Sequence, residues 1–131
     1  MTKARGLWAA TLIAALGTGC GNPASPGIQP QIINTADNFE YQTSNVRNYT
    51  GTSTYAWSNT GTAANVNQSA SITGGSVRLV ILDATNVQVY SRSLADNGTF
   101  PTTAGTAGTW TIRVEYSNGS GTVNFRVQKT T

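Results

Sequence analysis

Few side chains in this sequence of 131 residues can act as a general acid or base near neutral pH. There is one cysteine and no histidine, which excludes Ser-His-Asp and Cys-His arrangements and the commonest metal ligand. Two carboxylates could still act as a pair in glycoside hydrolysis. The five carboxylates are Asp37, Glu40, Asp83, Asp96 and Glu115. A small hydrolase is therefore the most remote function that the composition leaves open.

Two of these carboxylates, Asp83 and Asp96, lie in turn-forming segments, where aspartate commonly accepts hydrogen bonds from the local backbone. Together with Asn97 and backbone carbonyls they could bind Ca²⁺, which accepts oxygen ligands from loops. Neither segment has the dense acidic spacing of a dedicated calcium site. We therefore predict turn capping for both aspartates, and no catalytic residue, metal or cofactor.

The cysteine, Cys20, follows a segment with the three parts of a secretory signal peptide. Lys3 and Arg5 form the positive start, and Leu7–Leu16 forms an uncharged apolar middle of ten residues. A membrane-spanning helix needs about 20 residues, so this run is too short for a permanent anchor. Small residues then lead to a predicted cleavage site, and residues 1–19 are predicted to be removed.

The segment Gly17-Thr18-Gly19-Cys20 resembles the lipobox of bacterial lipoproteins, although the leucine usual at the position of Gly17 stands one residue earlier, at Leu16. The resemblance implies cleavage between Gly19 and Cys20, lipid attachment at Cys20, and membrane anchoring in the cell envelope by more than one acyl chain such as palmitate. Because Gly21 rather than aspartate follows, it also implies the outer membrane where the organism has one, facing the periplasm or the surface. The alternatives are a plain secretory signal with a free cysteine, or a small buried cysteine.

The leader contributes much of the chain's net charge of +3. Without residues 1–19, six basic and five acidic side chains remain, so no basic surface is expected and nucleic acid is not a predicted partner. Charged residues make up 10% of the chain, against about 25% in typical domains, and Thr, Ser, Asn and Gly take their place. The aromatic and β-branched runs favour an all-β domain with neutral, hydroxyl-rich outer faces over disorder.

Proline and glycine separate the leader from this domain. Pro23, Pro26 and Pro30 lie between Cys20 and Asp37, and this density disfavours regular strand pairing. We therefore predict a signal peptide over residues 1–19, a lipidated cysteine and tether over residues 20–37, and one folded domain over residues 38–131.

Period-two alternation and short apolar runs predict seven or eight short strands after residue 38, with no helix. Gly74-Gly75 is interpreted as a turn. The predicted fold is an antiparallel β-sandwich, similar to a jelly roll. The expected strands cover residues 39–43, 52–58, 64–72, 76–83, 87–92, a short stretch near 99–100, 110–116 and 123–127.

The last two of these strands flank Asn118-Gly119, which suits a two-residue hairpin turn. Such a hairpin would place Val114 opposite Val123, with every apolar pair on one face. Together with Gly105–Val114, this part of the sequence resembles the end of bacterial pre-peptidase C-terminal domains, which are small β-sandwiches that accompany secreted enzymes. The resemblance implies a non-catalytic accessory module.

Four aromatic side chains could stack on sugar rings if one sheet face exposes them. They are Tyr49, Tyr55, Trp57 and Tyr90, and core packing is the alternative for each. The leading hypothesis is a non-catalytic, lipid-anchored structural or interaction module of the cell envelope. A carbohydrate-binding module at the cell surface is the second, so envelope proteins or a glycan are the expected partners besides the membrane.

Overall fold

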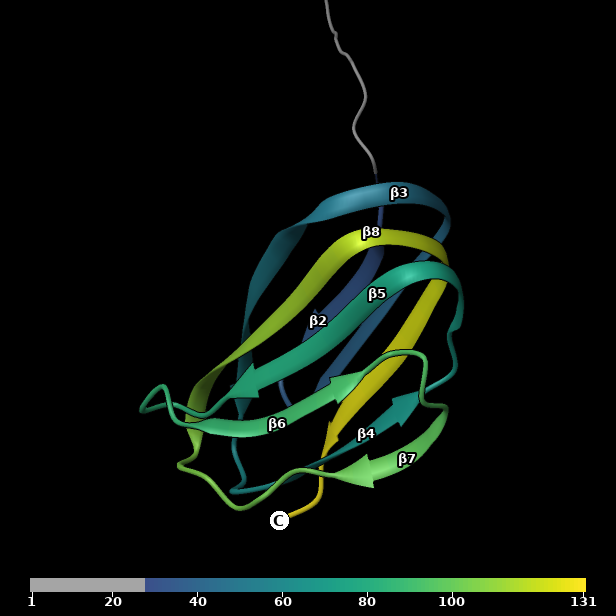
Figure 1. Ribbon diagram of the computed structural model, residues 1–131. Coiled ribbons are helices and arrows are strands. Elements are labelled where there is room, and N and C mark those ends of the chain that lie inside the picture. Colours follow the sequence, from purple (N-terminus) through teal and green to yellow (C-terminus); the bar gives the residue numbers. More distant parts are fainter. Residues whose placement is uncertain (1–27) are drawn as a thin grey trace, which may run out of the picture.

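The computed structural model describes residues 28–131. The predicted signal peptide, its cleavage site and Cys20 lie outside the described residues. The described part folds into one seven-stranded antiparallel sheet without α-helices, which confirms the all-β prediction (Figure 1). Its strands are β2 (Gln31–Thr35), β3 (Asn38–Asn59), β4 (Ala64–Gln68), β5 (Ser71–Leu82), β6 (Gln88–Ser93), β7 (Gly98–Pro101) and β8 (Gly108–Lys129). No helix among these residues is long and apolar enough to cross a membrane.

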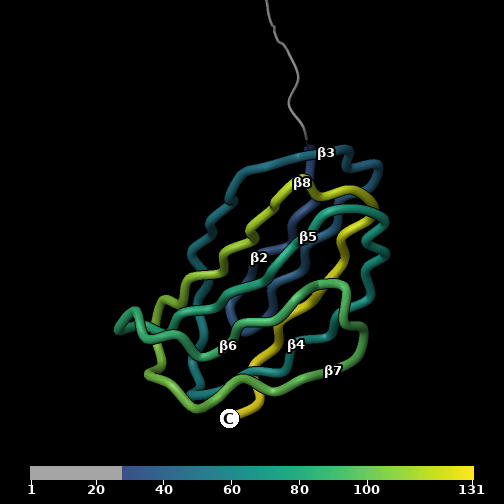
Figure 2. Tube along the Cα trace, in the orientation of Figure 1, coloured from purple at the N-terminus to yellow at the C-terminus, as the bar shows by residue number. Residues whose placement is uncertain are grey.

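Two strands of 22 residues, β3 and β8, organise the sheet by pairing along their whole length. The first half of β3 and the second half of β8 form one layer, in which the strand order is β2-β3-β8-β4-β7. The other halves form a second layer with β5 and β6. The trace in Figure 2 follows both long strands over one end of the molecule, so a single bent sheet makes both layers of the sandwich.

The bend lies where three neighbouring strands lose regular register together. In β3 the register shifts around Val46 and Tyr49, which lie opposite Gly121 and Gly119 of β8. In β5 it shifts around Gly74, which lies opposite Ser120. Positive φ angles occur at Asn45, Asn48, Gly75, Asn118 and Gly121, as is common in β-bulges. We call this part of the molecule the bent end.

The predicted hairpin at Asn118-Gly119 is wrong, because β8 continues through it as one strand. An Asn-Gly pair supplies the positive φ that either a tight turn or a bulge requires. The continuous partner strand β3 favours the bulge, since it pairs with Ile112 through Tyr55 and with Phe125 through Tyr41. The predicted apolar face is nevertheless confirmed, since all seven of its residues are buried: Trp110, Ile112, Val114, Tyr116, Val123, Phe125 and Val127.

Other predicted strand boundaries also differ from those in the structure, in part because residues predicted as turns form bulges within continuous strands. Gly74-Gly75 is a bulge within β5 rather than a turn, and the two strands expected at residues 39–43 and 52–58 are both part of β3. The strand expected at 64–72 is split between β4 and β5. Strand β2 lies inside the predicted tether range 20–37, because Ile32 packs against the core and the strand pairs with β3. The described fold therefore begins before residue 38.

The core between the two layers is rich in aromatic pairs. Trp57 and Trp110 meet edge to face at 5.9 Å, and Tyr41 stacks on Phe125 at 5.0 Å between ring centroids. The hydroxyls of Tyr41 and Tyr116 share a hydrogen bond of 2.5 Å. Burial raises the pKa of Tyr116 to about 12 and raises that of Tyr41 as well. Both phenols are therefore uncharged at neutral pH, and they join the layers near the bent end.

Candidate functional site

The four aromatic residues predicted as a sugar-stacking platform do not form one. Trp57 and Tyr90 are core residues, with exposed fractions of 1% and 7%. Tyr49 packs edge to face against Tyr116 at 5.0 Å, and Tyr55 packs against Phe39 at 5.5 Å between centroids. Period-two alternation places Tyr55 and Trp57 on one side of a strand, but that side faces the other layer. The alternative of core packing is the correct one for Trp57 and Tyr90, and Tyr49 and Tyr55 lie at the margin of the core.

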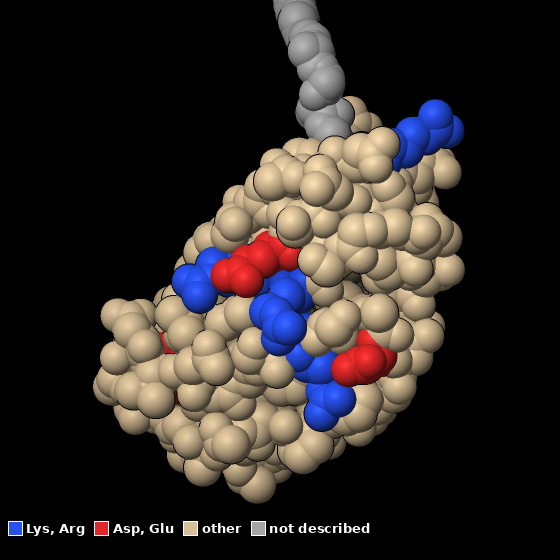
Figure 3. All heavy atoms as spheres, in the orientation of Figure 1, with Lys and Arg blue, Asp and Glu red and all other residues tan. Residues whose placement is uncertain are grey.

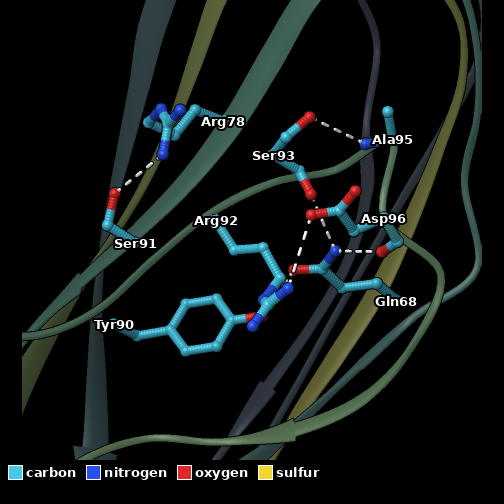
Figure 4. Close-up of polar contacts among 8 residues, drawn as sticks. All are labelled: Gln68, Arg78, Tyr90, Ser91, Arg92, Ser93, Ala95 and Asp96. Carbon is cyan, nitrogen blue, oxygen red and sulfur yellow. Dashed lines mark hydrogen bonds and ion pairs between the residues drawn. The ribbon is translucent and has the colours of Figure 1, made fainter.

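Tyr90 belongs to a polar contact that joins the two layers across their open edge (Figure 4). Its hydroxyl donates to Oε1 of the buried Gln68 at 2.6 Å, and the amide nitrogen of Gln68 donates to the carbonyls of Ser93 and Asp96. Burial raises the pKa of Tyr90 to about 12, so it remains a donor. Gln68 is thus a structural residue, and its only sequence signal is a polar side chain at an inward position of an alternating strand.

Arg92 of β6 contacts residues of both layers at the same edge. Its guanidinium carbon lies 3.8 Å from the centroid of the Phe100 ring of β7, and Nη1 lies 3.4 Å from a carboxylate oxygen of Asp96. A cation over an aromatic face contributes about 0.5–1 kcal/mol at partly exposed sites. The arginine therefore covers the gap between layers with its own contacts, and its charge is already paired.

Asp83 is a buried carboxylate satisfied by local backbone groups. Oδ1 accepts hydrogen bonds from the amides of Thr85 and Val87 and from the Thr85 hydroxyl, and Oδ2 accepts one from the Thr106 amide. These donors, led by the Val87 and Thr106 amides, lower its pKa to about 2. The turn-capping prediction is confirmed here, and the carboxylate also ties the loop at Thr106 to the turn after β5.

The candidate calcium ligands are engaged separately. The turn-capping prediction is wrong for Asp96, whose carboxylate pairs with Arg92 and accepts no backbone hydrogen bond within residues 28–131. The side-chain oxygen of Asn97 accepts a hydrogen bond from the Ala70 amide at 2.9 Å. Within residues 28–131, no three His, Cys, Asp or Glu side chains are grouped closely enough to hold a metal ion.

Three further carboxylates also contact neighbouring side chains. Asp37 accepts hydrogen bonds from the Thr60 amide and hydroxyl and lies 3.5 Å from Lys129 Nζ, and these contacts, led by the Thr60 amide, lower its pKa. Glu115 pairs with Arg113 at 3.0 Å. Glu40 accepts one hydrogen bond, from the amide of Asn38. Every carboxylate of the sequence thus has a local partner, and the partners of Asp83 and Glu40 are all neutral.

The outer faces of the two layers differ in chemistry. The face of the second layer, which we call the hydroxyl face, consists of Thr52, Thr54, Arg78, Val80, Ser91, Ser93, Arg113 and Glu115. Figure 3 views the molecule from the side of β5 and β6, where charged side chains of both signs lie next to one another in a band. Arg113 pairs with Glu115, and Arg78 donates to the Ser91 hydroxyl at 3.1 Å. The polar groups on this face largely satisfy each other.

The outer face of the first layer, which we call the amide face, carries seven amide side chains. Strand register places Gln31, Gln42 and Asn124 in one row, and Ile33, Glu40, Arg126 and Asn67 in the next. The remaining amides are Asn38, Asn65 and Gln128. The sequence predicts that most of these residues point outward. It does not predict that they lie side by side, because four separate strands contribute them.

A hollow of about 180 Å³ lies on the amide face over β2, β3 and β8. Its lining consists of Gln31, Ile32, Ile33, Glu40, Tyr41, Gln42 and Asn124. This volume is smaller than the roughly 300 Å³ at the low end for drug-sized ligand pockets. The hollow could therefore hold one small unit of a longer ligand lying across the face. We take it as the candidate functional site.

No protein-family model and no curated protein sequence matches the chain. Among solved structures, it is similar to the Glycosylation Associate Protein (Gap123) complex from Streptococcus agalactiae, with 13% identity, a TM-score of 0.42 and coverage of 80% of this chain and 40% of that one. It is also similar to the C-terminal CBM6 of LamC, a marine laminarinase from Zobellia galactanivorans, with 14% identity, a TM-score of 0.30 and coverage of 79% and 90%. The chain thus spans well under half of the first structure's length. Both TM-scores are too low to assign a function to this chain.

Proposed function

We propose that this protein is a non-catalytic, lipid-anchored component of the bacterial cell envelope, and that its β-sandwich acts as an interaction module. The signal-like segment ending at Cys20 supports the anchor and the location. The structural observation that carries the non-catalytic part of the proposal is the engagement of the carboxylates. Asp83 and Asp37 cap turns, and Asp96 and Glu115 pair with arginines, so all four have structural roles.

The attachment point of the tether fits this proposal. Strand β2 begins at Gln31, which lies opposite Gln42, close to the bulges of β3. A tether from Gly21 to Pro30 could reach at most about 35 Å. In the proposed anchored protein, the tether therefore joins the domain near the bent end.

Metabolic labelling with a fatty-acid analogue, followed by membrane fractionation, tests the anchor. The wild-type chain is expected to incorporate the label and to sediment with membranes, whereas Cys20→Ser is expected to lose both properties. Ser25→Ala, in the same predicted tether, is the matched control and should behave as wild type. Label incorporation that is unchanged in Cys20→Ser would refute the anchor.

The second candidate function is a carbohydrate-binding module. The aromatic platform that first suggested it is not formed, since Trp57 and Tyr90 are buried. The observation that now favours this function is the polar hollow on the amide face, formed by side chains that can donate and accept hydrogen bonds.

A further inference from the structure

Three amide side chains around the hollow are not used by the fold. Within the described residues, no hydrogen bond joins the side chains of Gln31, Gln42 or Asn124 to another protein group, although Asn124 is only partly exposed. Each of these amides offers two donor hydrogens and one acceptor oxygen in a plane. On the opposite face, Arg78, Arg113 and Glu115 contact one another or a serine. The amide face therefore keeps a row of donors and acceptors for an external partner.

One charged residue, Glu40, lines the hollow, and Arg126 lies beside it on β8, outside the lining. Glu40 and Arg126 are register partners on β3 and β8, yet no carboxylate oxygen of Glu40 lies within 4 Å of a guanidinium nitrogen of Arg126. One carboxylate oxygen of Glu40 accepts from Asn38. Glu40 would repel an anionic ligand, and Arg126 would repel a cationic one. A neutral ligand with hydroxyl groups could instead donate to the carboxylate and accept from the guanidinium.

We propose that the hollow between β2, β3 and β8 binds one ring of a neutral, hydroxyl-rich saccharide whose chain continues across the amide face. This inference rests on the second candidate function, a carbohydrate-binding module, and specifies the charge of its ligand and where the ligand lies. Vicinal hydroxyls match the paired donor and acceptor atoms of Gln42 and Asn124. Ile33, which is 52% exposed at the margin of the hollow, offers an apolar surface to the C–H groups of a sugar ring.

An extended peptide is a different occupant, and the geometry favours it less. Peptides add to sheets through the backbone of an edge strand, and the edge strand next to the hollow is β2. That strand has five residues and follows Pro30, and short edges next to proline resist strand addition. The amides of the hollow lie over the face of the sheet, on three strands. They match a ligand recognised by side chains.

The test is a titration of the full chain, purified in detergent, followed by amide signals in ¹⁵N-edited NMR spectra and by calorimetry. The probes are cellohexaose, chitohexaose and mannohexaose as neutral saccharides, oligogalacturonate as an acidic one, and an uncharged ten-residue peptide. We expect at least one neutral saccharide to shift the side-chain amide signals of Gln42 and Asn124. Gln42→Ala and Asn124→Ala should each weaken its binding by roughly fivefold, as loss of one hydrogen bond predicts.

Ser91→Ala and Thr54→Ala, on the hydroxyl face, are the matched controls and should leave affinity unchanged, and thermal unfolding verifies that every variant is folded. Three results would each overturn the inference: no shift with any neutral saccharide at millimolar concentration, binding of oligogalacturonate alone, or peptide shifts confined to the backbone of β2. Fatty-acid labelling of the same preparation reports on the anchor independently. A labelled protein without saccharide binding would refute this inference and leave the proposed anchor standing.

Discussion

The two outer faces of this sandwich come from the same bent sheet and share two of its strands, but their polar side chains are used differently. On the hydroxyl face, Arg113 pairs with Glu115 and Arg78 bonds to Ser91. On the amide face, Asn38 donates to Glu40 and Asn67 donates to Thr99, but the side chains of Gln42 and Asn124 have no hydrogen-bond partner among residues 28–131. Polar groups that satisfy one another stabilise the fold, whereas groups left to solvent can bind a ligand without a stability penalty. The unpaired amides Gln42 and Asn124 are the reason that we propose the amide face as the recognition surface.

The largest expected effect comes from removing the bend that separates the two faces. Gly121 has φ +126°, and a Cβ there would lie 2.0 Å from the carbonyl oxygen of Ser71. Gly121→Ala combines backbone strain with a clash against another strand, so it should lower the free energy of unfolding by about 3 kcal/mol or more. Chemical denaturation measures the loss.

Gly74→Ala is the control for this change, because it lies in the same bent end but has ordinary space for a methyl group. Its added Cβ would lie 3.6 Å from the Ser120 side chain, and its φ is not positive. The expected change is below about 1 kcal/mol in either direction. Equal losses in the two variants would mean that the bend does not depend on the backbone conformation of Gly121.

A second prediction contrasts an amide used by the fold with one that is not. Gln68 accepts from Tyr90 and donates to two carbonyls in the interior, so Gln68→Ala leaves several buried polar groups without partners. Since one such group costs about 1–3 kcal/mol, the variant should lose about 3 kcal/mol of stability. Gln42→Ala, on the amide face, should stay within about 0.5 kcal/mol of wild type. A comparable loss in Gln42→Ala, measured by the same denaturation experiment, would show that the amide face does support the fold.

The third prediction compares the effect of pH on a carboxylate used by the fold, Asp83, with that on a carboxylate of the amide face, Glu40. The folded pKa of Asp83 is about 2, below its ordinary value of 3.8, because backbone amides stabilise the charged form. A depressed folded pKa contributes stability that is fully present above the unfolded value and is lost as the pH falls towards the folded one. Asp83→Asn should therefore flatten the fall in melting temperature between about pH 4 and pH 2 and lower stability at pH 7.

Glu40→Gln serves as the control on the amide face and should leave the melting temperature at pH 7 unchanged, because its carboxylate accepts a single hydrogen bond from Asn38. Asp37, whose pKa is also lowered by the Thr60 amide, should preserve part of the acid sensitivity in Asp83→Asn. A melting profile of Asp83→Asn identical to that of wild type would contradict the structural role of this carboxylate.

The sequence predicts the composition of each face better than the arrangement of strands. Alternation correctly identifies the buried side of β8 from Trp110 to Val127, because burial of one face imposes period two. It cannot distinguish a turn from a bulge at Asn118-Gly119, since both require positive φ and only a partner strand decides between them. For the same reason, the row of Gln31, Gln42 and Asn124 has no local signal. Its members lie up to 93 positions apart in the sequence and meet through strand order alone.

The aromatic residues fail as a predicted site for a related reason. Tyr55 and Trp57 share one side of a strand, which alternation detects. Whether that side is outer or inner depends on which layer covers it, and the structure turns it towards Phe39 and Trp110. Large rings contribute most to stability when buried, so core packing outweighs exposure wherever a second layer is present.

The smallest expected effect compares one arginine from each face. Arg113 lies 3.0 Å from Glu115, and both side chains are more than one-third exposed, so Arg113→Ala should cost no more than about 0.5 kcal/mol. Arg126 forms no ion pair within residues 28–131, so Arg126→Ala should leave stability unchanged. The same variant should weaken the binding of any saccharide that accepts a hydrogen bond from the guanidinium. At about 1 M salt the Debye length falls to about 3 Å, so the difference in stability between the two variants should disappear. A larger loss in Arg126→Ala than in Arg113→Ala, measured by denaturation at low salt, would reverse the roles assigned to the two faces, because it would place the stabilising charge contact on the amide face.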